Sequence, residues 1–241
     1  MKNQTKFLKG LHDGLPIGLG YLSVSFAFGI MAVSGGLPVW AAVAISMTNL
    51  TSAGQVAGLG VIFSSASYLQ MALTQLVINI RYALMSLSLS QKLSTATTRL
   101  NRFGIAFGIT DEIFALAAIQ PGEISSSYMY GLICLPFCGW TLGTLLGALA
   151  GSVIPAAVQS ALGIAIYAMF IAIIIPPAKK ARPVCFVVAA ALILSSLFTW
   201  VPGLNRVSSG YAVIICAVAA AALGALLFPH TPGQEGGATD V

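Results

Sequence analysis

Apolar residues recur in long runs from residue 15 to residue 228. A helix that crosses a bilayer needs roughly 20 such residues, and each run approaches or reaches that length. We therefore expect eight hydrophobic segments, at Leu15 to Val33, Pro38 to Phe63, Tyr68 to Ser90, Phe103 to Ile119, Tyr128 to Ala150, Pro155 to Ile175, Val184 to Val201 and Tyr211 to Phe228. The predicted fold class is all-α, a polytopic transmembrane helical bundle of about seven to eight hydrophobic segments.

Little of the chain lies outside these segments. Residues 1–13 form a basic N-terminal arm with Lys2, Lys6 and Lys9, which we expect on the cytoplasmic side. Residues 14–228 are predicted to form a single transmembrane domain. Residues 229–241 are rich in glycine and polar side chains, so they lack the apolar surface to offset the entropy of ordering and are predicted to be disordered.

The composition excludes a water-soluble fold. Apolar residues make up 58% of the chain and charged residues 7%, against roughly 25% charged residues in soluble domains. Nearly all of the excess lysine and arginine falls in short connections between apolar segments, which is the positive-inside bias of membrane proteins. The basic character therefore does not indicate a nucleic-acid partner.

The basic connections also constrain the topology. Lys2 to Lys9, Lys92 to Arg102 and Lys179 to Arg182 should share the cytoplasmic side. Three predicted helices separate each consecutive pair, so each interval needs one segment that enters and leaves on the same side. The second segment is the better candidate, because polar and helix-weakening residues crowd its middle, namely Ser46, Thr48, Asn49, Thr51, Ser52, Gly54 and Gln55. The sixth segment is the candidate in the other interval.

This charge pattern favours an inverted repeat, with half-repeats at about 14–90 and 127–202, as is common in secondary transporters. The alternative is eight plain crossings with one basic connection outside. Gly143, Gly147 and Gly151 recur at every fourth residue. Such spacing predicts a face on which a second helix backbone approaches closely.

Three charged residues lie inside the predicted hydrocarbon zone: Arg81 in the third segment, and Asp111 and Glu112 in the fourth. A charge at mid-membrane costs about 2.5 to 3.5 kcal/mol on insertion scales, so Arg81 should have a partner. Positions 81 and 112 are equally far from the centre of the connection between their segments. Arg81 is therefore expected to meet Glu112 or Asp111 at matching depth.

Two interpretations of these charges remain open. In one, a buried ion pair fixes the register of the two helices and does nothing else. In the other, Arg81 holds a substrate carboxylate while the remaining carboxylate takes a proton or a substrate ammonium group, an arrangement that suits a zwitterion. Asn79, with Gln75 one turn before it, and Asn49 and Gln55 in the second segment could complete an amide-lined site. Each amide could instead form an ordinary interhelical hydrogen bond.

No metal site and no cofactor are expected. The four cysteines lie within apolar runs, where they behave as small buried hydrophobes, at Cys134, Cys138, Cys185 and Cys216. His12 and His230 lack ligand spacing to another histidine or cysteine.

Two other classes of function compete with transport. An intramembrane enzyme would need paired acids at metal spacing, a Ser and His arrangement or two aspartates, and the adjacent pair Asp111 and Glu112 supplies none of these. We therefore expect no enzyme. A non-transporting membrane scaffold would need the charged residues only for stability.

Three stretches carry a resemblance to a known family: Val77 to Tyr82, Ile109 to Leu116 and Leu142 to Ala148. They resemble the AzlC-type branched-chain amino acid permease family, and the likeness extends from about Gly14 to Leu227. The resemblance implies a secondary transporter subunit in the bacterial cytoplasmic membrane, exporting valine and related neutral amino acids, with methionine as a further candidate. It also implies a small hydrophobic partner subunit of the AzlD type.

The family's Asn-x-Arg falls on Asn79 and Arg81, and its Thr-Asp-Glu falls on Thr110, Asp111 and Glu112. Two departures bear on substrate identity more than on mechanism. Where members often have Phe-Ala-Gly-x-x-Gln, this chain has Leu-Thr-Ser-Ala-Gly-Gln over residues 50–55, and Tyr82 replaces a frequent histidine.

Overall fold

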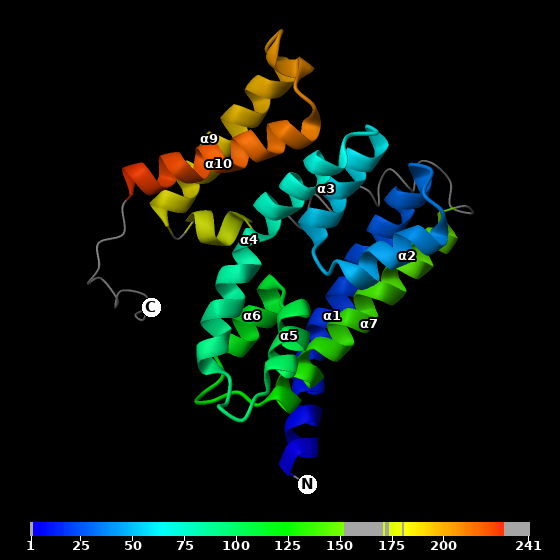
Figure 1. Cartoon of the computed structure of the whole chain (residues 1–241), viewed down its shortest axis with the longest axis vertical. Coiled ribbons are helices and arrows are strands. Elements are labelled where there is room, and N and C mark those ends of the chain that lie inside the picture. Colours follow the sequence, from blue (N-terminus) through cyan, green and yellow to red (C-terminus); the bar gives the residue numbers. More distant parts are fainter. Residues whose placement is uncertain (1, 152–170, 172–173, 180, 229–241) are drawn as a thin grey trace. The chain divides into compact units, whose positions relative to one another are not determined.

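The computed structural model describes residues 2–151, 171, 174–179 and 181–228 (Figure 1). The chain divides into two compact units, residues 1–169 and 170–241, which are described separately. The first unit contains α1 (Lys2–Ser34), α2 (Val39–Thr48), α3 (Ser52–Phe63), α4 (Tyr68–Lys92), α5 (Arg99–Phe107), α6 (Asp111–Ala118) and α7 (Ser126–Ala150). The second contains α9 (Arg182–Trp200), the short 3-10 helix η1 (Leu204–Arg206) and α10 (Ser209–Leu227).

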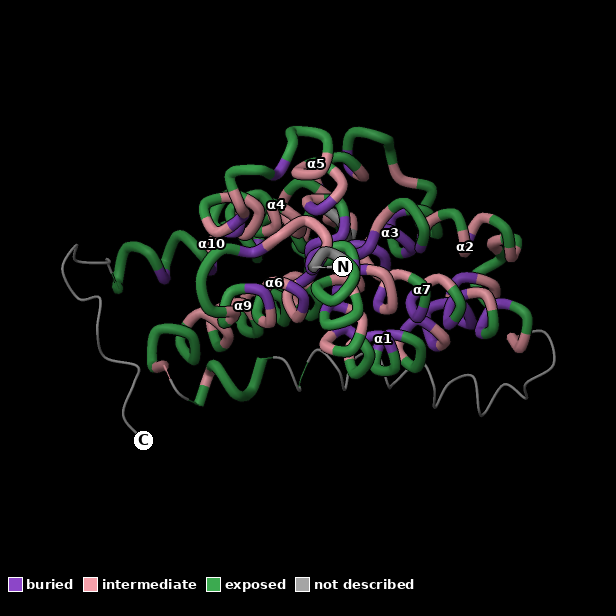
Figure 2. Tube along the Cα trace, turned by 90° about the horizontal axis from the view of Figure 1, so that it is seen from below, coloured by how far each residue is buried: buried purple, intermediate pink, exposed green. Residues whose placement is uncertain are grey.

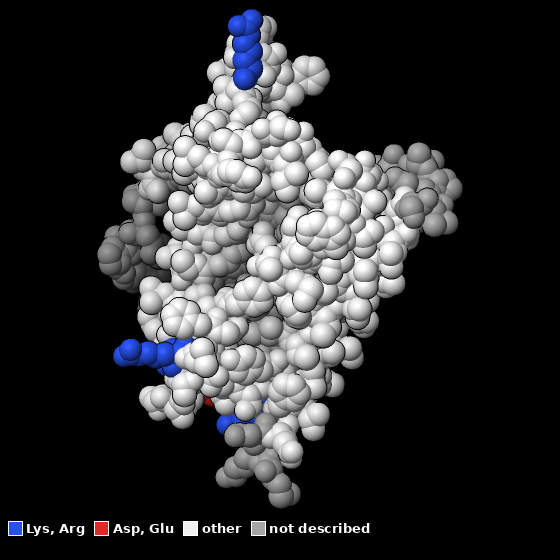
Figure 3. Space-filling view, turned by 45° about the vertical axis from the view of Figure 1, so that its right-hand side comes forward, with Lys and Arg blue, Asp and Glu red and all other residues white. Residues whose placement is uncertain are grey.

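The expected all-α, multi-pass membrane fold is confirmed. Among the described residues, α1, α4, α7 and α9 are long and apolar enough to cross a bilayer. Lysine, arginine, aspartate and glutamate are sparse on the surface seen in Figure 3, which is almost entirely white. Such a surface suits contact with lipid rather than water.

The centre of the first unit is a parallel pair of helices, α1 and α7, which lie side by side in Figure 1. Glycines allow the contact: Gly131 lies on the backbone at Gly10, Gly139 on Gly18, and Gly147 on Phe26. The separation along the chain is the same in every pair, so the helices run in the same direction and in register. The prediction that Gly143 and Gly147 permit a close backbone approach is confirmed.

The second hydrophobic segment is broken, as its polar middle predicted. α2 ends at Thr48 and α3 begins at Ser52, with Asn49, Leu50 and Thr51 between them. The Thr51 hydroxyl accepts a hydrogen bond from the Gly54 amide and so caps the new helix. The ring of Phe63, at the end of α3, lies against Gly35, just after α1. The segment therefore returns to the end at which it started.

The fourth hydrophobic segment is also broken, and the expectation that it forms one continuous span is wrong. α5 ends at Phe107 and α6 begins at Asp111, where the Thr110 hydroxyl accepts a hydrogen bond from the Ile113 amide. The start of α5 and the end of α6 both lie beside the last turn of α4. Arg102 Nη1 donates to the Ser90 carbonyl at 2.9 Å, and Lys92 Nζ donates to the Ala118 carbonyl.

The basic arm and the second basic connection lie at one end of the unit, as predicted. Lys9 Nζ donates to Gln120 Oε1 at 2.8 Å, and the Ile124 amide donates to the Lys92 carbonyl at 2.9 Å. We call this end, with Lys6, Lys9, Lys92, Arg99 and Arg102, the basic end. Because the fourth segment returns to it, the charge pattern no longer requires a return by the sixth segment, which lies largely outside the described residues.

In the second unit, α9 and α10 form an antiparallel pair joined through η1 (Figure 1). Val187 packs against Gly224, and the rings of Phe186 and Phe228 are 5.7 Å apart. Buried residues are concentrated in the first unit, whereas α9 and α10 are mostly exposed (Figure 2). The predicted inverted orientation of the half-repeats at about 14–90 and 127–202 is wrong, because α1 and α7, the first helix of each half, run in the same direction. The single domain at 14–228 and the tail after Pro229 include residues outside the described ones and stay predictions.

Candidate functional site

An ion pair forms between Arg81 and Asp111. Arg81 Nη2 lies 2.9 Å from Asp111 Oδ2, and the two side chains retain 46% and 36% of their exposure. Arg81 is next to the midpoint of α4, and Asp111 is the first residue of α6. The predicted meeting of the arginine with an acid of the fourth segment is confirmed, with Asp111 as the partner. The pair is therefore only partly buried, so a third polar group can reach both charged side chains.

Glu112 has a different partner, Tyr21 of α1. The Tyr21 hydroxyl donates to Glu112 Oε2 and lies 2.6 Å from the Thr110 hydroxyl. The ring of Tyr21 is 8% exposed and packs edge-on against Trp140 of α7, with 5.1 Å between ring centroids. Tyr21 therefore connects the central helix pair to the start of α6, at the break between α5 and α6. Glu112 is therefore not paired with Arg81. The zwitterion interpretation requires such a carboxylate, because it is left to bind a substrate ammonium group or a proton.

Tyr82 connects the ion pair to the other broken segment. Its ring centroid lies 5.0 Å from the Arg81 guanidinium carbon, and Arg81 Nη2 donates to its hydroxyl at 3.3 Å. The same hydroxyl donates to the Thr51 hydroxyl at 3.4 Å. Since Thr51 caps α3, two hydrogen bonds connect Arg81 with the N-terminus of that helix.

The amides form a cluster between α4 and the break in the second segment, beside the start of α3 that Tyr82 also contacts. Gln75 Oε1 accepts from Asn79 Nδ2 at 3.0 Å and from Asn49 Nδ2 at 3.4 Å, while Gln75 Nε2 donates to the Gly54 carbonyl at 2.8 Å. Asn79 and Arg81 are two residues apart on a helix, so their side chains leave it in different directions. The structure brings Asn49 and Asn79 together through Gln75.

Gln55 is the most deeply placed of the predicted site residues, at 1% exposure. Its amide nitrogen donates to the Asn49 carbonyl, which stabilises the break itself. Its oxygen accepts from the Ser46 hydroxyl at 3.5 Å, and Ser46 lies 2.7 Å from the Thr144 hydroxyl of α7. These contacts attach the broken segment to the central helix pair.

A small pocket of about 170 Å³ lies between α2, α3 and α4. Its wall combines the amides of Asn49 and Gln75 with the apolar side chains of Ile45, Leu59, Ile62 and Met71. Nearby, Asn79 Oδ1 is buried without a hydrogen-bond partner in the described part of the chain, and the same holds for Trp140 Nε1. A buried polar atom without a partner costs about 1 to 3 kcal/mol, so such atoms are typical places for a ligand or water.

The two helix starts differ in charge. Asp111 and Glu112 lie in the first turn of α6, where carboxylates offset the partial positive charge of the helix dipole. The first turn of α3 has no acidic residue. The site therefore offers an uncompensated helix start and a guanidinium on one side, and two carboxylates on the other.

All six predicted site residues lie at or beside the two breaks, in two groups: Arg81, Asp111 and Glu112 in one, and Asn49, Gln55 and Asn79 in the other. Their roles stay predictions. Sequence reasoning missed Tyr21, because nothing in an apolar helix marks which aromatic side chain faces a polar site. Among the described residues, no three His, Cys, Asp or Glu side chains lie close enough to hold a metal ion.

Comparison with known proteins identifies relatives of this chain by sequence. The family model described as AzlC protein matches residues 16–154. The chain is 29% identical to the "Inner membrane protein YgaZ" of Escherichia coli over 194 residues, covering 78% of each chain. It is 31% identical to an "Uncharacterized membrane protein" of Archaeoglobus fulgidus over 181 residues, 74% of this chain and 79% of that one. No solved structure matches.

Proposed function

Since the chain belongs to the AzlC family, we propose that it is a secondary transporter subunit that exports branched-chain or similar neutral amino acids, valine foremost, across the bacterial cytoplasmic membrane. Methionine is the second candidate substrate. The observation that carries the proposal is the partly buried Arg81–Asp111 ion pair at the meeting point of two broken, returning helices. Broken helices that meet at the midplane are the usual substrate sites of secondary transporters.

The substrate carboxylate binds between Arg81 and the start of α3. Arg81 already reaches this helix start through Tyr82 and Thr51. A guanidinium and free helix N–H groups are complementary to a carboxylate. The ammonium group faces the carboxylates on α6, where Asp111 exchanges Arg81 for the substrate. Glu112 either completes this contact or carries a coupling proton, with Tyr21 positioning it.

The substrate side chain fits the pocket beside the amides. Its volume of about 170 Å³ is well below the roughly 300 to 1,000 Å³ typical of sites for drug-sized ligands, which favours a solute the size of one amino acid. The apolar wall of Ile45, Leu59, Ile62 and Met71 suits a branched or thioether side chain. Such a wall separates substrates that differ by one methylene by only about 1 to 3 kcal/mol, so several neutral amino acids should compete.

The transporter includes a small hydrophobic partner subunit of the AzlD type. Many large apolar side chains remain exposed on the described helices, among them Leu76, Leu84 and Leu192. Lipid and a partner helix both suit such a surface, so the partner is tested by co-purification.

The experiment is valine counterflow in proteoliposomes that contain this chain with its proposed partner. Wild type is compared with Arg81→Ala and Glu112→Gln at matched folded levels, with Arg206→Ala as an arginine control outside the site. Stereospecific exchange should be lost in both site variants and kept in the control. Robust exchange in all variants contradicts the assigned site, and no exchange by an intact complex counts against amino acids as substrates.

A non-transporting scaffold is the rival, because the 2.9 Å ion pair could serve packing alone. Arg81→Lys distinguishes the two. Lysine keeps the charge but loses the planar fork that binds a carboxylate at two points. A transporter should lose valine affinity by about tenfold or more with little change in thermal stability. A scaffold should show no valine-dependent stabilisation in either form.

A further inference from the structure

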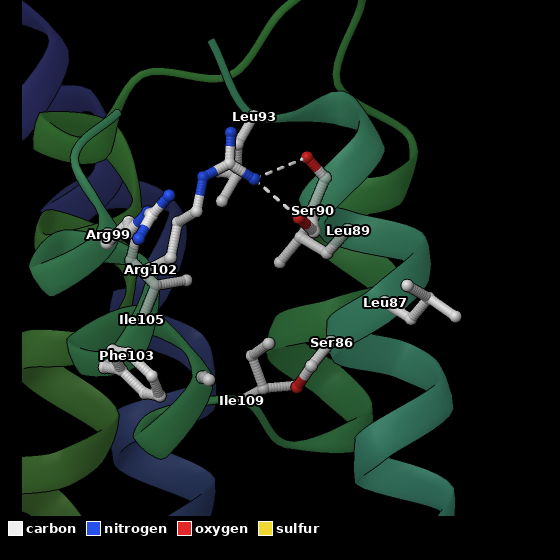
Figure 4. Close-up of a pocket in the computed structure, with 11 residues that line it drawn as sticks. Ser86, Leu87, Leu89, Ser90, Leu93, Arg99, Arg102, Phe103, Ile105 and Ile109 are labelled. Atoms are coloured by element: carbon white, nitrogen blue, oxygen red, sulfur yellow. Dashed lines mark hydrogen bonds between the residues drawn. The ribbon is translucent and has the colours of Figure 1, made fainter. Parts of the chain in front are cut away.

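A second cavity lies in the first unit, apart from the ion pair and the amide cluster. It is a groove of about 480 Å³ between α4 and α5, and nearly all of its lining is apolar. Leu89, Phe103 and Ile109 contribute to its walls (Figure 4). A solute the size of one amino acid does not need a cavity of this volume.

Two arginines stand at one end of the groove. Arg102 extends from α5 to the last turn of α4, where Nη1 donates to the carbonyl and the hydroxyl of Ser90 (Figure 4). Arg99 lies one turn earlier on the same helix and is exposed. Among the described residues, the ion pairs are Arg81 with Asp111 and His12 with Asp13, so neither groove arginine has a carboxylate partner. The two positive charges are left for a ligand.

The groove has a polar end and an apolar end. Ser86 and Ile109 lie at the opposite end from the Arg102 guanidinium (Figure 4). The arginines belong to the basic end, which the positive-inside bias assigns to the cytoplasm. A phospholipid of the cytoplasmic leaflet has the same orientation, with its phosphate at the membrane surface and its acyl chains toward the midplane.

We propose that the groove between α4 and α5 is a binding site for an anionic phospholipid, with Arg99 and Arg102 on the headgroup phosphate and an acyl chain along the apolar walls. Charge complementarity selects the anionic class, because basic pockets between transmembrane helices bind acidic headgroups. The lipid bridges α4, which carries Arg81, and α5, which leads to Asp111. By contacting both helices, the lipid stabilises the relative positions of Arg81 and Asp111.

The test measures lipid binding to the purified full chain in detergent. Phosphatidylglycerol and phosphatidylcholine with identical acyl chains are titrated separately, and bound lipid is counted by native mass spectrometry alongside the melting temperature. The site should bind phosphatidylglycerol at least tenfold more tightly and raise the melting temperature. Inorganic phosphate alone should do neither, because the apolar walls would stay empty. Equal binding of the two lipids overturns the proposal.

Variants locate the site. Arg99→Gln should weaken phosphatidylglycerol binding by about tenfold, the effect of losing one charge-assisted hydrogen bond. Arg206→Gln makes the same charge change in the second unit and should bind as wild type does. Ala106→Phe keeps both arginines but fills the groove, so it should reduce binding as strongly. Arg102→Gln is avoided as the main variant because Arg102 also caps the end of α4. Unchanged binding in both Arg99→Gln and Ala106→Phe overturns the assignment to this groove.

Discussion

Tyr21 does more at the candidate site than its sequence context suggests. Its neighbours Gly20 and Leu22 are unremarkable in an apolar helix, yet its hydroxyl reaches both Glu112 and Thr110. The charged residues could be predicted because each one in hydrocarbon is costly and therefore conspicuous. A tyrosine is common in membrane helices, so only the packing of α1 against α7 and α6 shows where Tyr21 points.

Tyr21→Phe is the prediction at this scale. The change removes one hydroxyl and leaves the edge-on contact with Trp140 intact, so the fold should survive. Glu112 should lose its positioning donor, and valine counterflow should fall by about tenfold. Tyr211→Phe in the second unit is the matched control. Counterflow that is unchanged in Tyr21→Phe would show that Glu112 needs no positioning by Tyr21.

At the scale of helices, one break was predictable and the other was missed. The second segment shows its break through many polar residues between Ser46 and Gln55. The fourth segment is interrupted over only Gly108, Ile109 and Thr110. A signal was present, because a threonine followed by two acids is typical of a helix start. The capping pattern is short, however, and lies inside an apolar run that is otherwise long enough to span the membrane.

The glycine contacts of the central pair give the prediction for this scale. Gly147 is buried on the Phe26 backbone, so a methyl group there has no room. Gly147→Ala should lower the free energy of unfolding by roughly 1 to 3 kcal/mol through overpacking. Gly20→Ala is the matched control, because a Cβ at Gly20 meets no atom within 4 Å. The measurement is denaturation in mixed micelles, and equal stability of the two variants would contradict the close packing of α1 and α7.

For the whole molecule, the positions of the basic connections predicted the number of returning segments in the first interval correctly. In the second interval they indicated one return, which was expected in the sixth segment, whereas the fourth segment is the one that returns. The positive charges indicate on which side of the membrane a connection lies. They do not indicate which of the helices between two connections returns to its starting side. The contacts of α5 and α6 with the end of α4 supply that missing information.

Cysteine labelling tests this topology in intact cells. In a background with the four native cysteines replaced by alanine, Thr95→Cys and Glu123→Cys should label from the same side, because both flank the returning α5–α6 segment. Ser64→Cys, after α3, should label from the opposite side. Lys179→Cys should match Thr95→Cys through the positive-inside bias. Labelling of Thr95→Cys and Glu123→Cys from opposite sides would mean that the fourth segment crosses the membrane.

The glycine-to-backbone contacts between α1 and α7 also have a mechanical consequence. Helices whose backbones touch at several glycines cannot slide past each other, so α1 and α7 form one rigid unit. The returning segments contact this pair through hydroxyl groups, such as Tyr21 with Thr110 and Ser46 with Thr144, and through apolar packing, such as Ile113 in the buried cluster with Met129. Single hydrogen bonds of this kind are weak enough to exchange. We therefore expect the α1–α7 pair to stay fixed during transport, while conformational change takes place in the two returning segments.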